Sequence, residues 1–136
     1  MNGIDLLVAD HRVVDERFAA FAEAPAADIA GQIVDLLITH DDAEQSALYP
    51  LIDEVLGPDA AAQARREHSV VKKLLDRARQ QEGAALVSTM TALQAAVTDH
   101  VRHEEVELFP RLAEAATATQ LDWLAAHLEQ TKQRVG

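Results

Sequence analysis

Apolar residues recur along this chain at alternating intervals of three and four, the spacing that gathers side chains on one face of an α-helix. The pattern occurs in four segments, at about residues 4–22, 29–52, 61–75 and 84–116. The segments are separated by Pro25, Gly57-Pro58 and Gly83. Asp28 and Asp59 stand where N-caps of the second and third helices are expected. Pro50 predicts a kink or an end within the second segment.

A fifth apolar stripe lies near the end of the chain, where Leu121, Leu124 and Leu128 follow helical spacing. The composition also favours helices, because alanine is abundant and only five glycines and four prolines interrupt the chain. We therefore predict an all-α fold, an up-down-up-down antiparallel four-helix bundle over about residues 4–116 with a short fifth C-terminal helix over about residues 119–134. We expect a single domain over residues 1–136.

Each of the four bundle stripes is interrupted by a histidine, and two stripes also carry a glutamate one turn later. The histidines are His11, His40, His68 and His100, and the glutamates are Glu44 and Glu104. An uncompensated polar side chain destabilises a core, and a buried charge does so far more strongly, so six such groups must satisfy one another. A metal ion is the simplest common partner. These six residues are therefore the predicted metal ligands.

The two halves of the chain repeat the same signatures in the same order. Asp-His-Arg-Val-Val at residues 10–14 reappears as Glu-His-Ser-Val-Val at residues 67–71. His-x-x-x-Glu-x-x-x-Leu-Tyr-Pro at residues 40–50 reappears as His-x-x-x-Glu-x-x-x-Leu-Phe-Pro at residues 100–110. Two helical hairpins related by a pseudo-two-fold axis would bring the histidines to one level, with both glutamates between them. The repeat predicts a symmetric two-metal site with bridging glutamates, suited to iron, zinc, manganese or nickel.

This set of motifs resembles the hemerythrin or HHE cation-binding family over about residues 4–115. The resemblance implies a four-helix bundle that holds two iron ions bridged by an oxo or hydroxo group, with zinc or manganese as substitutes. It implies small-molecule partners, namely oxygen, hydrogen peroxide and nitric oxide. Members of the family bind oxygen, handle peroxide or nitric oxide, or sense iron and oxygen.

Two departures from the oxygen-carrying members of the family bear on function. Those members have a second histidine one turn after the third-helix histidine, where this chain has Lys72. Their last carboxylate corresponds to Glu105, but we prefer Glu104 as the ligand because it lies on the apolar stripe and copies the spacing of Glu44. Two imidazoles, two carboxylate oxygens and one bridging oxygen leave one open place on each octahedral iron. Open places on both ions favour redox turnover over reversible oxygen carriage.

The leading functional hypothesis is a di-iron protein that reacts with hydrogen peroxide or oxygen, in peroxide breakdown or in protection against oxidative and nitrosative stress. The alternative is a non-enzymatic protein that binds or senses oxygen, nitric oxide or iron. A di-zinc or metal-free bundle without redox chemistry is a third hypothesis. A ferritin-like site requires Glu-x-x-His on two helices, and no histidine of this chain has an acidic residue three positions earlier.

Other polar residues near the predicted ligands have open roles. His103 repeats the His-x-x-x-Glu spacing but lies off the apolar stripe, which favours the surface or a contact behind a ligand. Asp15 is expected to form a hydrogen bond or ion pair beside the site, with metal ligation as the second option. The residues expected to be solvated are Asp41, Asp42 and Glu105. Tyr49 and Phe109 are expected to pack at the end of the bundle, with a redox role for Tyr49 as the weaker alternative.

The charge of the chain limits its expected partners. A formal net charge of −11 argues against nucleic acid and anionic lipid, because both require a basic face. The sequence identifies no protein partner. It contains no cysteine, which excludes disulfides and thiolate metal sites. The first residues lack the pattern of a secretion signal and no stretch approaches ~18 consecutive apolar residues, so we expect no membrane span and a cytoplasmic location.

Overall fold

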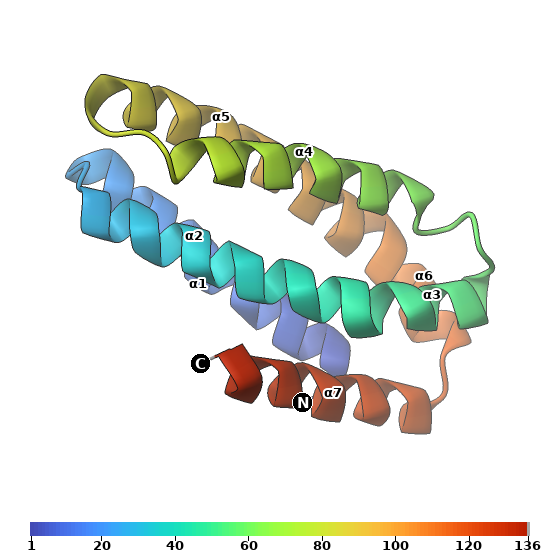
Figure 1. The fold of residues 1–136 in the computed structure, drawn as a ribbon. Coiled ribbons are helices and arrows are strands. Elements are labelled where there is room, and N and C mark those ends of the chain that lie inside the picture. The colour runs from blue at the N-terminus through green and yellow to red at the C-terminus, as the bar shows by residue number, and fades with distance from the viewer. Residues whose placement is uncertain (136) are drawn as a thin grey trace.

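The computed structural model describes the backbone of residues 1–135 and the side chains of residues 1–131 (Figure 1). Its elements, in chain order, are α1 (Gly3–Glu23), α2 (Ala27–Ala43), the π-helical turn η1 (Glu44–Leu48), α3 (Tyr49–Leu56), α4 (Ala62–Ala78), α5 (Gly83–His103), the π-helical turn η2 (Glu104–Leu108), α6 (Phe109–Ala115) and α7 (Ala118–Val135). The described part of the chain contains no strand, and the predicted all-α class is confirmed.

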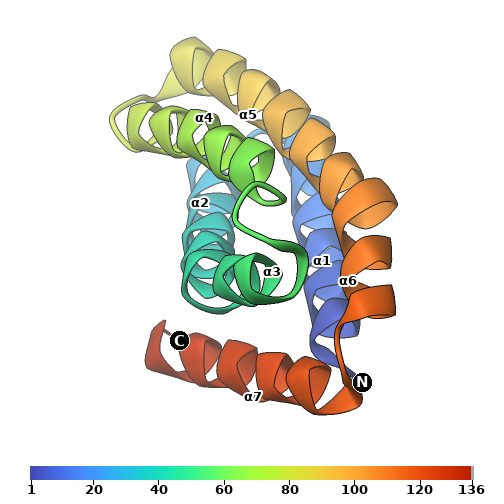
Figure 2. The same ribbon diagram turned by 90° about the vertical axis from the view of Figure 1, so that its right-hand side faces the viewer.

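Four long helices form the bundle, and two of them are composite. The elements α2, η1 and α3 follow one another without a break, and so do α5, η2 and α6. α1 packs against α2, α4 packs against α5, and α3 packs against α6 (Figure 1). The helix α7 runs across one end of this up-down-up-down bundle (Figure 2). Within the described residues, no helix has the length and apolar character needed to cross a membrane. The assignment of residues 1–136 to a single domain stays a prediction.

The predicted ligands form a polar layer between two hydrophobic cores. On α1, Leu7 belongs to the core beside α7, Val14 belongs to the opposite core, and His11 lies between them. The histidine of α2 is flanked in the same way by Leu37 and Ala43. The apolar cores therefore hold the four helices together on both sides of the polar layer, and this fixes the level at which the polar groups meet.

The two predicted N-caps are wrong. α2 begins at Ala27 and α4 begins at Ala62, and no side-chain hydrogen bond caps either helix. Asp28 instead lies within the first turn of α2, where its negative charge interacts favourably with the helix dipole. Asp59 lies in the turn before α4, and its carbonyl oxygen accepts a hydrogen bond from the N–H of Ala62. The backbone of that turn, rather than the aspartate side chain, supplies the local hydrogen bond.

Pro50 does not end its helix, because a π-helical turn comes directly before it. In η1 the N–H of Tyr49 donates to the carbonyl oxygen of Glu44, five residues earlier, and the helix continues to Leu56. A proline inside a regular α-helix crowds the carbonyl group four residues earlier, and a wider turn relieves this crowding. The same arrangement precedes Pro110 in the second half of the bundle. Both π-helical turns begin at a predicted metal ligand.

α7 reaches the bundle through a close contact with the first turn of α1. Leu124 and Leu128 of α7 are buried in the same core as Leu7. Gly3 lies directly against Leu124, and a Cβ atom added at Gly3 would be 2.4 Å from Leu124 Cγ. Carbon atoms in favourable contact are about 3.5–4.0 Å apart. The missing side chain at residue 3 therefore allows α7 to pack this closely.

Gly3→Ala is expected to destabilise the protein by on the order of 1–3 kcal/mol, because the added methyl group overlaps Leu124. The matched control is Gly31→Ala on α2, where an added Cβ atom meets nothing within 4 Å. That variant is expected to gain about 0.5–1 kcal/mol, because alanine has less conformational freedom than glycine in the unfolded chain. Urea titrations followed by circular dichroism measure both changes. Equal stability of the two variants would contradict the proposed close contact.

Candidate metal centre

Six buried polar side chains meet in the layer between the two cores, and each comes from a different element. They are His11 on α1, His40 on α2, Glu44 on η1, His68 on α4, His100 on α5 and Glu104 on η2. At most 9% of any of these residues is exposed, and both glutamates are fully buried. The structure thus brings together all six of the residues that the sequence predicts as ligands.

The six side chains form two groups that share both glutamates. The first position consists of His11, His40, Glu44 and Glu104, and the second position consists of His68, His100, Glu44 and Glu104. One nitrogen or oxygen atom from each residue lies within 4.8 Å of the corresponding atoms in its group. Each glutamate directs one oxygen toward each position, so the pair could bridge two ions.

The ligand atoms of the first position have the separations expected around one small ion. The Nε2 atoms of His11 and His40 are 3.2 Å apart. His40 Nε2 lies 3.1 Å from Glu44 Oε2, and His11 Nε2 lies 3.3 Å from Glu104 Oε1. Adjacent ligands of an octahedral ion with bonds of about 2.1 Å are about 3 Å apart. Glu44 Oε2 and Glu104 Oε1 are buried and have no hydrogen-bond partner among the described side chains, so a cation fits this position and would compensate both oxygens.

The second position contains an additional polar group. His68 Nε2 lies 2.6 Å from Glu44 Oε1, and His100 Nε2 lies 3.2 Å from Glu104 Oε2. The hydroxyl oxygen of Tyr49 is 3.0 Å from Glu104 Oε2 and 3.3 Å from Glu44 Oε1. It is also 3.3 Å from His100 Nε2. Tyr49 is buried as expected, but its hydroxyl lies among the predicted ligands rather than in end-of-bundle packing alone.

Each ligand histidine directs Nε2 to the centre and Nδ1 to a carboxylate on another element. The pairs are His11 with Glu105 at 2.7 Å, His100 with Glu67 at 2.9 Å, His68 with Asp41, and His40 with Asp10 at 3.6 Å, which is longer than a hydrogen bond. A carboxylate only accepts hydrogen bonds, so Nδ1 carries the proton and a neutral imidazole keeps its Nε2 lone pair free. Such outer carboxylates orient metal-binding imidazoles and increase their basicity.

The expectation that Asp41 and Glu105 are solvated is wrong. Asp41 and Glu105 each contact a ligand histidine, and Glu105 also forms an ion pair with Arg12. Asp42, the neighbour of Asp41, is exposed as expected. Asp15 forms an ion pair with Arg12 at 2.9 Å on the surface. Asp41 and Glu105 thus lie at sequence positions that do not distinguish them from solvated residues.

Asp10 and Glu67 do not belong to the predicted set of site residues, although the repeat contains a signal for them. They are the acidic residues directly before His11 and His68 in the two copies of the first motif. Each lies behind the histidine of the neighbouring helix in its own hairpin. His103 Nδ1 also lies 2.9 Å from Glu67 Oε1, which places His103 behind the ligands, one of its two expected roles.

In the metal-free protein, the imidazoles and carboxylates of the site shift one another's pKa values so that the charged forms of both are favoured. Burial lowers the pKa of His40, but Glu44 and Asp10 outweigh it and raise the pKa to about 10. Burial lowers the pKa of His100 as well, and Glu104 and Glu44 raise it to about 11. Burial raises the pKa of Glu44, but His40 and hydrogen bonds from His100 hold that pKa well below its ordinary value. Metal uptake must therefore displace protons from the histidines.

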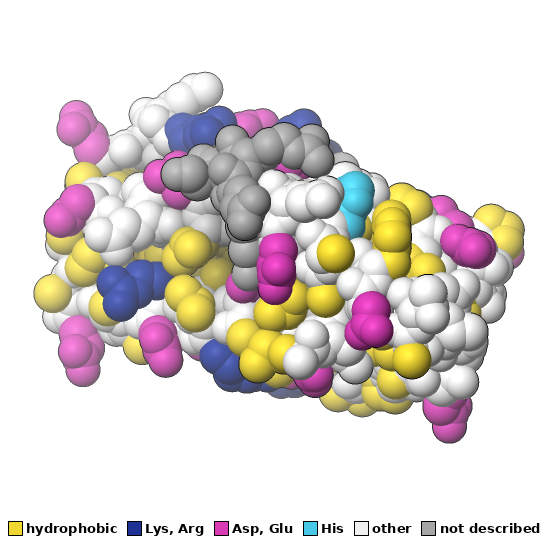
Figure 3. Space-filling model, turned by 90° about the horizontal axis from the view of Figure 1, so that it is seen from below, with side chains coloured by type: hydrophobic (Ala, Val, Ile, Leu, Met, Phe, Trp, Pro, Cys, Tyr) yellow, Lys and Arg dark blue, Asp and Glu magenta, His cyan; other side chains and the backbone are white. Residues whose placement is uncertain are grey.

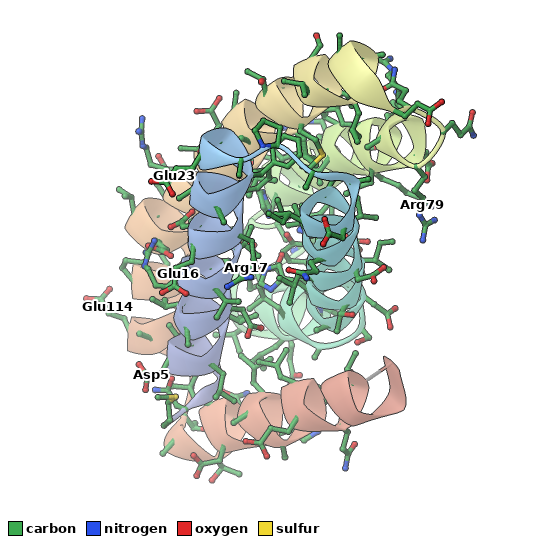
Figure 4. The ribbon with its side chains drawn as sticks, turned by 90° about the vertical axis from the view of Figure 1, so that its left-hand side faces the viewer. Asp5, Glu16, Arg17, Glu23, Arg79 and Glu114 are labelled. Atoms are coloured by element: carbon green, nitrogen blue, oxygen red, sulfur yellow. The ribbon has the colours of Figure 1, made fainter. Side chains whose placement is uncertain are left out.

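A small cavity lies beside the four histidines. Its volume is about 20 Å³, and its other lining residues are Asp41, Val14, Leu37, Val71, Val97 and Val101. Such a volume accommodates about one water-sized molecule. An open groove of about 990 Å³ runs along α1 and α2 and shares Val14 and His40 with the cavity. Arg17 projects from α1 toward α2 in this groove and donates a hydrogen bond to Gln32 (Figure 4).

The four inward histidines and two shared carboxylates are typical of a metal-binding four-helix bundle. The chain matches the family described as "Hemerythrin HHE cation binding domain" over residues 2–112, and it belongs to that family. It is also similar to a protein named "DNA nickase" from Nostoc sp. (strain PCC 7120 / SAG 25.82 / UTEX 2576), with 26% identity over 141 residues. The match covers 99% of this chain and 40% of the relative, so the chain spans less than half of the relative's length. No solved structure matches the chain significantly.

Asp41→Asn is expected to weaken metal binding by roughly 10–100-fold, because it removes the carboxylate that orients His68. The matched control is Asp42→Asn, which removes the same charge from the adjacent exposed residue and should leave the affinity nearly unchanged. Competition with a chromophoric chelator measures both affinities. Equal weakening by the two variants would mean that net charge, rather than the contact with His68, controls metal affinity.

The stability of the metal-free protein is expected to fall as the pH rises above about 6.5. Because the pKa values of His40 and His100 are raised from 6.5 to about 10 and 11, their contribution is complete below pH 6.5 and is lost as the pH rises through that range. The lowered pKa of Glu44 has the opposite sign, so its contribution is present above pH 4.5 and is lost in acid. Thermal melts of chelator-treated protein across this range test the prediction, which a rise of melting temperature above pH 6.5 would contradict.

Proposed function

We propose that this chain binds two iron ions and reacts with hydrogen peroxide or oxygen. The ligands are His11 and His40 for one ion, His68 and His100 for the other, and Glu44 and Glu104 as bridges between them. The observation that carries the proposal is that each glutamate offers one oxygen to each position. Bound iron supplies the electrons and the Lewis acidity for peroxide and oxygen chemistry. Zinc and manganese suit the same nitrogen and oxygen ligands.

The surrounding residues prepare the site for small reactants. The outer carboxylates hold the imidazoles with Nε2 directed inward, so the ligands need little rearrangement when metal binds. The lining of the adjacent cavity is mostly apolar apart from the histidines, and its volume of about 20 Å³ excludes larger organic molecules. These features support oxygen, hydrogen peroxide and nitric oxide as reactants.

The position of Lys72 argues against reversible oxygen carriage. Oxygen-carrying relatives have a further imidazole one turn after the third-helix histidine, and in this chain Lys72 is exposed. Val71, one residue earlier, is buried and lines the cavity. Among the described residues of the centre there are thus four inward imidazoles. With no imidazole at residue 72, the described ligand set departs from that of the oxygen-carrying members, which favours turnover over reversible oxygen carriage.

The surface charge supports a small-molecule function rather than DNA cleavage. The DNA nickase relative is more than twice as long as this chain, and its name describes that protein. Here the formal net charge is −11, and acidic side chains are spread over the face that carries α7 (Figure 3). Binding to a phosphate backbone requires clustered Lys and Arg side chains. We therefore infer that the metal centre acts on small molecules in solution.

Protein loaded with ferrous iron is expected to hold two irons per chain and to consume hydrogen peroxide with release of oxygen. Glu44→Ala should lose most of both ions, because it removes an anionic ligand from each position. His11→Ala should mainly weaken the first position. Metal analysis and an oxygen electrode measure these outcomes, and zinc-loaded protein is the control for a filled site without redox chemistry.

Two results would change the proposal. One iron per chain in the wild-type protein would exclude the bridged centre. Two irons without any reaction with peroxide, oxygen or nitric oxide would exclude the enzymatic proposal. The non-enzymatic alternative, in which iron occupancy itself controls the stability of the bundle, would then take its place.

A further inference from the structure

The sequence repeat breaks at a side chain that reaches the metal centre. Tyr49 and Phe109 occupy equivalent places in the two halves, each directly before a proline. Both are buried against a ligand histidine: the Tyr49 ring meets His68 edge-on at 5.2 Å between centroids, and the Phe109 ring stacks on His11 at 6.0 Å. In both halves the ring thus packs on a ligand histidine, although the ring orientations differ, and the chemical difference is the tyrosine hydroxyl.

The Tyr49 hydroxyl belongs to the second position. Its three close neighbours are Glu104 Oε2 at 3.0 Å, Glu44 Oε1 at 3.3 Å and His100 Nε2 at 3.3 Å, and all three are ligand atoms of that position. A phenol has one proton, so it donates a full hydrogen bond to only one of the two carboxylate oxygens. Separations of about 3 Å are those of adjacent ligands on one ion. A cation here would have the phenol oxygen as a further ligand.

Among the residues that the structure describes, the first position has no corresponding group. Phe109 presents only carbon atoms, and Glu44 Oε2 and Glu104 Oε1 have no hydrogen-bond partner. This position also lies toward the open groove along α1 and α2, which His40 lines together with Val14. Tyr49 therefore offers an additional ligand atom at the second position, whereas the first position, which faces the groove, has space for a small molecule.

We propose that the Tyr49 oxygen is a ligand of the ion at the second position, so that small molecules bind to the ion at the first position. Tyr49 binds as a phenolate, and its proton leaves to solvent as the ion enters, as for other acidic ligands. The inference rests on the proposed two-ion site. It replaces the symmetric count from the sequence, in which each ion keeps one open place.

The test uses the full chain loaded with two ferric ions. Because Tyr49 is the only tyrosine in the sequence, any phenolate-to-iron absorption and any enhanced tyrosine vibrations in the resonance Raman spectrum must come from it. We expect both signals in the wild-type protein and neither in Tyr49→Phe. Azide, a small anion that binds open places on ferric ions, should bind once per two irons in the wild type and twice in Tyr49→Phe.

The outcomes separate this inference from the proposed function. Two irons without tyrosine signals in the wild type would overturn the assignment of Tyr49 and leave the two-ion site intact, and this measurement needs no variant to fold. Fewer than two irons would overturn both. Equal azide stoichiometry in wild type and Tyr49→Phe would overturn the assignment of the open position. Tyr49→Phe copies the phenylalanine of the other half, and circular dichroism checks that it keeps the helical fold.

Discussion

The constraint on which the rest of this structure depends is the burial of four imidazoles and two carboxylates in the middle of a helical bundle. Glu44 and Glu104 are fully buried, and an unpaired carboxylate at such a place would strongly destabilise the fold. The chain compensates them with imidazoles from all four long helices, and it compensates the imidazoles with an outer set of acidic residues. The polar layer therefore connects every bundle helix, and it leaves two carboxylate oxygens unsatisfied until a cation arrives.

The bundle and the meeting of its inward polar groups could be predicted because their signals lie within single helices. Helical spacing requires only residues of the same segment, and the repeat puts His40 and His100 at equal depth without tertiary information. The same argument extends to Asp10 and Glu67, since an acidic residue precedes the histidine in both copies of the first motif. Features that occur in both copies of the repeat could therefore be predicted from the sequence.

Contacts between side chains of different helices could not be predicted from the sequence in the same way. The contact of Asp41 with His68 depends on the rotation and crossing angle of two helices, which vary by more than a hydrogen bond tolerates. The π-helical turns change the predicted positions of side chains even more than the helix crossing angles do. In a regular α-helix, Tyr49 would lie about 140° around the axis from Glu44, far from the ligand face. The wider turn η1 brings it nearer to that face, and so the tyrosine hydroxyl reaches the ligands although its spacing predicted packing at the end of the bundle.

The two halves share a backbone but differ in the polar atoms around the centre. The carboxylates behind His40 and His100 come from repeated positions, whereas those behind His11 and His68 do not. Asp41 corresponds in the repeat to Val101, Glu105 corresponds to Gln45, and Tyr49 corresponds to Phe109. Asp41 and Tyr49 carry polar groups where the other half has apolar side chains of similar shape, and Glu105 carries a charge where the other half has a neutral amide. The helices therefore pack alike while the two positions acquire different surroundings. The fold thus holds two similar positions at equal depth, and the residues that break the repeat give these positions different chemical surroundings within one bundle.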